Sequence, residues 1–149
     1  MRQFTETNYK LLLGMVRMAL TSTKFDYSVS RTDGESIEFS DPCTGIRGIF
    51  EVDADKSFYS ISITEKVIDG VDEMTITNFE KICFPEEKHD FMWYDSESET
   101  VEFGFYLEPD DTTTSINSIM CFILNAVQIV ERFRWLLLTH SMLNKIQKA

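Results

Sequence analysis

The apolar residues of this 149-residue chain change their spacing twice, and that change limits the folds available to it. Between residues 6 and 20 they recur every three or four positions, as on one face of a helix. From residue 25 to residue 63 they alternate with polar residues, as in strands that bury one face. Helical spacing returns after residue 116. Because no linker, repeat or low-complexity stretch divides the chain, we predict one α+β domain over residues 1–149.

We expect an N-terminal helix from about Glu6 to Leu20. Thr5 precedes it as an N-cap, and Phe4 and Tyr9 have the spacing of a hydrophobic staple. An antiparallel meander of four short strands should follow, with tight turns between them. One of these turns is marked by Asp33-Gly34. The expected inward residues are Phe25, Tyr27 and Val29, then Ile37 and Phe39, then Ile46, Gly48, Phe50 and Val52, then Tyr59, Ile61 and Ile63.

The stretch from Val67 to Pro85 fits neither period, and we expect a short helix in it over roughly Ile76 to Cys83. Pro85 should help to end that helix. A β-hairpin is predicted next, with strands at 91–94 and 101–107, and Gly104 weakens the second strand or marks a bulge. A long C-terminal helix then runs from residue 116 through residue 137, and the helices should cover one face of the sheet.

This order of elements resembles the YbjN-type family and the wider type III secretion chaperone-like fold. The local likeness is strongest in the second half of the chain. It lies in two segments, Asp90-Phe91-Met92-Trp93-Tyr94-Asp95 and Thr100-Val101-Glu102-Phe103-Gly104-Phe105-Tyr106-Leu107, and in the long apolar helix that follows them. The resemblance implies an acidic, often dimeric cytoplasmic protein without enzymatic activity. Such a protein holds or regulates another protein.

Charge and cysteine usage restrict the partners and the compartment. Twenty-five acidic residues against 14 basic ones give a net charge of −11. This charge repels nucleic acid and anionic lipid, so a protein partner with a basic surface is favoured. The apolar tract from Ile116 to Leu138 contains charges that would cost on the order of several kcal/mol in a bilayer, so we interpret it as a buried helix rather than a membrane span.

Cys43, Cys83 and Cys121 form no C-x-x-C pair, which indicates free thiols in the cytoplasm.

No motif in the sequence points to catalysis, a metal or a cofactor. The tract after Asp53 begins like a calcium loop, but Phe58 occupies the position that requires Gly and Thr64 the position that requires Glu. His89 and His140 are about fifty residues apart and lack further zinc ligands at a suitable spacing. Nucleophile and phosphate-loop motifs are missing as well. We therefore predict no catalytic residue, no metal ligand and no cofactor.

The C-terminal helix is apolar over more than one face, and one sheet covers only one stripe of it. The first stripe is Ile116, Ile119, Ile123, Val127, Val130 and Leu137, and the second is Phe122, Ile129, Phe133 and Leu136. Either the N-terminal helix or a second subunit should cover the second stripe. We take the second stripe as the candidate interface of a homodimer.

Three functions are compatible with these observations. The first is a protein-binding module, chaperone-like or regulatory, and the missing chemistry and acidic charge favour it. The second is a small-ligand-binding or enzymatic domain with a cavity between sheet and helices. The third is a phage or immunity protein that inhibits a larger target.

Overall fold

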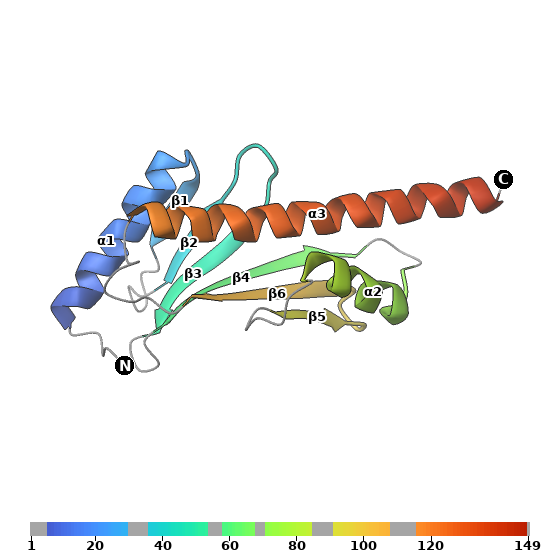
Figure 1. Cartoon of the computed structure of the whole chain (residues 1–149), viewed down its shortest axis with the longest axis horizontal. Helices are drawn as coiled ribbons and strands as arrows, with labels where there is room; N and C mark the ends of the chain where they lie inside the picture. Colours follow the sequence, from blue (N-terminus) through green and yellow to red (C-terminus); the bar gives the residue numbers. More distant parts are fainter. Residues whose placement is uncertain are drawn as a thin grey trace.

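The computed structural model describes residues 6–29, 36–53, 58–67, 71–84, 91–107 and 116–148. They form three helices and one six-stranded antiparallel sheet, so the predicted α+β fold is confirmed (Figure 1). The helices are α1 (Glu6–Ser22), α2 (Glu73–Cys83) and α3 (Ile116–Lys148). The strands are β1 (Asp26–Val29), β2 (Ser36–Ser40), β3 (Arg47–Asp53), β4 (Phe58–Lys66), β5 (Phe91–Asp95) and β6 (Thr100–Leu107). Our expectations for Phe4, Thr5, Asp33-Gly34 and Pro85 concern residues outside the described ranges.

The sheet has the strand order β1-β2-β3-β4-β6-β5, with every neighbouring pair antiparallel. The chain leaves β4, passes through α2 and returns as the β5–β6 hairpin, whose second strand pairs with β4. On the inner face the register aligns Ile37, Phe50, Ile61 and Phe105 in one row and Phe39, Gly48, Ile63, Phe103 and Met92 in another. Gly48 has no side chain because the Phe39 ring occupies the space that a Cβ would need.

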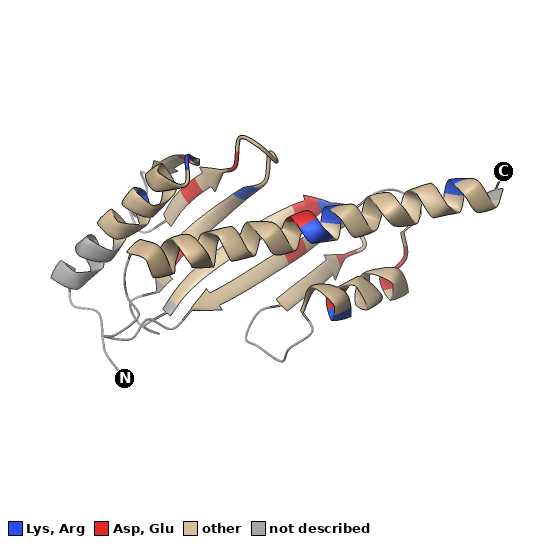
Figure 2. Cartoon of the chain, turned by 45° about the horizontal axis from the view of Figure 1, so that its top comes forward, with Lys and Arg blue, Asp and Glu red and all other residues tan. Residues whose placement is uncertain are grey.

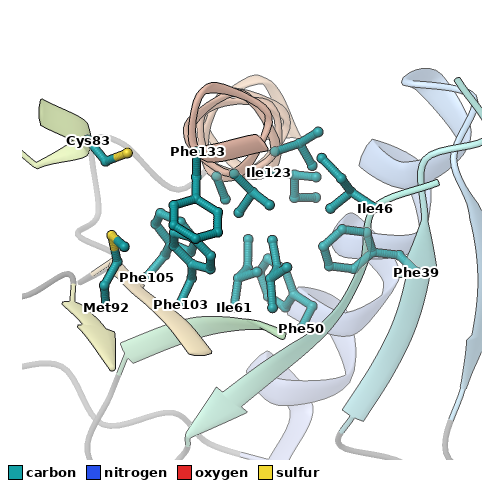
Figure 3. Packing of buried hydrophobic residues seen from close by; sticks show 14 of the residues in the cluster. Phe39, Ile46, Phe50, Ile61, Cys83, Met92, Phe103, Phe105, Ile123 and Phe133 are labelled. Carbon is teal, nitrogen blue, oxygen red and sulfur yellow. The ribbon is translucent and has the colours of Figure 1, made fainter. Parts of the chain in front are cut away.

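All three helices lie on this inner face (Figure 1). Helix α1 packs against the first half of α3, and α2 packs against α3 further along. The contact between α3 and the sheet centres on Phe133, whose ring meets Phe103 edge-on with the ring centroids 5.1 Å apart (Figure 3). The centroid of the Phe79 ring on α2 lies 6.2 Å from that of Phe133. Aromatic rings at these distances add about 0.5–1.5 kcal/mol per pair to the burial of their surface.

Helix α2 begins earlier than we expected, at Glu73 instead of Ile76. The reason is an N-cap: one Asp72 carboxylate oxygen accepts hydrogen bonds from the Thr75 hydroxyl at 2.7 Å and the Thr75 backbone N–H at 2.8 Å. These bonds hold the pKa of Asp72 below its usual value, the hydroxyl bond contributing most. The stabilisation is therefore present at neutral pH and is lost as the pH falls through the lowered pKa.

Two other expectations need correction. The register of β6 against β4 continues unbroken through Gly104, so no bulge forms there. Instead, the Phe91 ring from β5 lies over Gly104, where a Cβ would collide with it. Helix α3 also continues past Leu137 to Lys148.

The length of α3, with a mean hydropathy of 1.3 over its most apolar 18 residues, would allow it to cross a membrane, on length and composition alone. In the domain it covers the sheet instead. A third of that window is buried, and Ile119, Ile123, Ala126, Val130 and Phe133 have no exposed surface. Removing the helix would expose the inner rows of the sheet to water.

Phe133→Ala should lower the free energy of unfolding by about 3–5 kcal/mol, because it leaves a cavity between three elements. Urea denaturation measures this loss. Met18→Ala, at a 57% exposed position on α1, is the control and should cost less than about 0.5 kcal/mol. Similar losses for the two variants would contradict the central role of Phe133.

Candidate protein-binding surfaces

The C-terminal half of α3 carries an exposed apolar row, which we call the outer stripe: Trp135, Leu138, Met142 and Ile146. These side chains are 47–69% exposed. At 100° per residue they fall within an arc of about 80°, opposite the buried residues Ala126 and Phe133. Residues 135–144 include no Asp, Glu, Lys or Arg. In Figure 2 the charges of α3 accordingly gather near its middle and near its C-terminal end.

The interface residues expected from the sequence lie closer to the core. Phe133 is fully buried within the chain. Phe122 is half-buried and meets Phe50 edge-on at 5.9 Å, and Ile129 and Leu136 pack half-buried against the same core. Sequence reasoning missed the outer stripe because it followed the helix only to Leu137. The signal was available, since 135, 138, 142 and 146 have helical spacing.

Arg134 fixes α3 to the sheet immediately before the outer stripe begins. Its Nε and Nη2 atoms reach Glu65 Oε1 on β4 at 2.9 and 2.8 Å. Its Nη1 donates to the backbone carbonyl of Thr44, in the turn between β2 and β3. One guanidinium thus joins three segments, and Glu65 is only 13% exposed, so the pair is partly shielded from water.

The turn that presents Thr44 is built around Asp41. The buried Asp41 carboxylate accepts hydrogen bonds from the Cys43 N–H at 2.9 Å and the Thr44 hydroxyl at 2.8 Å. Gly45 closes the turn with φ of 74°, a left-handed conformation that glycine adopts without strain. The Asp41-Pro42-Cys43-Thr44-Gly45 signal in the sequence therefore encodes a rigid anchor for Arg134.

The face of the sheet away from the helices is open and forms the second candidate surface. An open hollow of about 740 Å³ crosses β1 to β4 and reaches Glu102 of β6. The floor of the hollow is formed by small outward side chains, including Ser62 and Thr64 on β4, which leave space above the sheet. Longer side chains around it, such as Glu38, Arg47 and Ile49, form its walls.

An aromatic group lies beside this hollow on the same face. Trp93 is 59% exposed and pairs in register with Glu102, which also lines the hollow. Phe91 lies two residues before Trp93 on β5, and its ring stacks on Tyr106 at 5.9 Å. The open face therefore combines carboxylates with exposed aromatic rings.

The buried titratable groups have the properties of packing residues. Burial raises the pKa of Tyr59 to about 12 and that of Cys83 to about 11, so both are neutral at pH 7. His140 packs edge-on against Phe79, and its Nε2 lies 3.1 Å from Asn144 Nδ2. Within the described ranges, no three His, Cys, Asp or Glu side chains are placed to hold a metal ion.

No family model matches the chain, and no curated protein matches its sequence. Among solved structures, the chain is similar to one described as "Structure of the HopA1-SchA Chaperone-Effector Complex", with a TM-score of 0.61. The match covers 84% of this chain and 94% of the other, at 6% sequence identity. The chaperone-like fold is thereby confirmed. None of these comparisons shows membership of the YbjN-type family.

Arg134→Ala should cost about 2–3 kcal/mol of stability, because it leaves the shielded Glu65 carboxylate without its cation. A double-mutant cycle with Glu65→Ala, followed by urea denaturation, isolates the pair. Arg132→Ala, at an exposed position on the same helix, is the control. Equal losses at Arg132 and Arg134 would contradict the role of Arg134 as an anchor.

The three thiols should differ in reactivity. Cys43 and Cys121 are exposed, whereas Cys83 is buried and its pKa is raised to about 11. Because the thiolate is the reactive form, Ellman's reagent at pH 8 should label two cysteines rapidly and the third only after unfolding. Rapid labelling of all three in the native protein would refute this placement of Cys83.

Proposed function

We propose that this protein is a non-enzymatic, chaperone-like module of the cytoplasm that binds other protein chains and acts as a homodimer. The outer stripe is the observation that carries the proposal. It extends over about 17 Å of helix. Soluble proteins rarely expose a large contiguous apolar surface, and where they do, it usually marks a site that a partner covers. A fold shared with a chain of a chaperone–effector complex supports the same function.

A second copy of the chain fits the outer stripe by its charges. Glu131 lies one turn before Trp135, and Lys145 lies three residues after Met142. At 100° per residue, Glu131 continues the line of the stripe toward the N-terminus, and Lys145 lies about 20° outside its Leu138 edge. An antiparallel pairing of two α3 helices centred on Leu138 brings Glu131 of one copy opposite Lys145 of the other, on both sides of the contact between the two Leu138 side chains. Such an arrangement is isologous, as in most homodimers. We place the interface here rather than on Phe122, Ile129, Phe133 and Leu136, which pack within the chain.

The packing supports this function over a small-ligand or enzymatic domain. That alternative requires a cavity between sheet and helices. Phe50, Phe103 and Phe133 occupy this space (Figure 3). The large hollow lies on the opposite face of the sheet. An inhibitor of a larger target would use the same two surfaces, and it remains a hypothesis about the identity of the partner.

Light scattering at micromolar concentration should give a mass about twice 17.3 kDa. Leu138→Glu should produce a folded monomer, because a charge would then lie unpaired in the apolar contact. Leu124→Glu, on the same side of α3 but before the outer stripe, should remain a dimer. A mass near 17.3 kDa for the unmodified protein, or dissociation by both substitutions alike, would contradict the dimer.

Affinity capture from the native lysate, read by mass spectrometry, tests the binding of a further protein. We expect one protein to be enriched reproducibly at low salt. Recovery of no specific protein under gentle conditions would count against the chaperone-like function.

A further inference from the structure

The charges that line the open hollow are strongly unbalanced. Asp26, Glu38, Glu51 and Glu102 contribute four carboxylates, whereas Arg47 contributes one guanidinium. Among the described residues, one ion pair forms, between Glu65 and Arg134 on the inner face of the sheet. The four carboxylates of the hollow therefore have no cation at ion-pair distance among these residues. A concave surface with charge of one sign focuses its field and attracts the opposite charge.

The aromatic rings next to the hollow favour the same ligand chemistry. Trp93 is the most exposed of them, and its register partner Glu102 lines the hollow. A guanidinium or ammonium group can therefore stack on an indole and approach a carboxylate at adjacent positions. Cation–π contacts of this kind are strongest with Trp.

We propose that the open face of the sheet is the docking site for a cationic segment of a partner protein, one that carries several Arg or Lys side chains. This inference rests on the proposed protein-binding function and specifies the chemistry of the partner. The volume of the hollow, about 740 Å³, falls within the range of about 300–1,000 Å³ that small-molecule and cofactor sites span, so it has room for side chains of a partner segment. A second copy of this chain does not suit it, because each copy carries a net charge of −11. The dimer contact on α3 leaves this face free.

A short oligo-arginine peptide with a fluorescent label is the probe, and an oligo-glutamate peptide is the negative control. We expect saturable binding by fluorescence anisotropy that weakens between about 50 and about 300 mM NaCl. Glu38→Gln combined with Glu51→Gln should lower the affinity about tenfold, because two exposed charge contacts are lost. Glu73→Gln combined with Glu80→Gln changes the net charge equally on α2 and should change the affinity less than about twofold.

The two tryptophans allow the site to be located directly. In a Trp135→Phe variant, Trp93 is the single indole, and its emission should change as the peptide saturates the protein. In a Trp93→Phe variant, Trp135 reports on the outer stripe and should not respond to the peptide.

The proposal is overturned if the two double variants weaken binding equally, if Trp93 emission stays constant while the peptide binds, or if no saturable binding occurs. Its failure is separable from that of the dimer. A dimeric mass without peptide binding removes only the cationic site, whereas peptide binding by a 17.3 kDa monomer removes only the dimer.

Discussion

The contact between α3 and the inner face of the sheet is the interaction on which the rest of the domain depends. Phe133 meets both the sheet and α2, and α1 and α2 cover the sheet edges that α3 leaves free. Helix α3, at 33 residues, is about 50 Å long. The longest strand, with nine residues, spans about 30 Å. Both candidate surfaces follow from this geometry: one helix layer leaves the other face of the sheet open, and a helix longer than the sheet extends past it (Figure 1).

The order of the elements could be read from the sequence because each has a clear local pattern. The alternation around Ile37, Phe50 and Ile61 predicts strands, and the spacing from residue 116 onward predicts the long helix. The start of α2 was harder, since Asp72 and Thr75 had to be recognised as a cap. The end of α3 was missed because the polar residues Thr139 and Ser141 obscure the apolar spacing after Leu137.

The candidate surfaces were predictable only in part, because they depend on which strands are neighbours. Glu38, Glu51 and Ser62 were readable as outward residues from alternation alone. Nothing local indicates that β6, rather than β5, pairs with β4, and that pairing brings Glu102 to the hollow. The outer stripe, in contrast, belongs to a single helix. Its composition was visible in the sequence, although its exposure depends on how far α3 extends past the sheet.

The overhanging end of α3 links helix formation to assembly. Arg134 ties the helix to β4 and the 41–46 turn, and the packing of α3 decreases after it. Leu137 is still buried and His140 meets Phe79 edge-on, but Met142, Leu143 and Ile146 near the C-terminal end are more than half exposed. Helices of about 12–15 residues are marginal in water without tertiary support. The folded length of α3 should therefore depend on the concentration of its binding partner. Association then contributes part of the free energy that keeps the last turns helical.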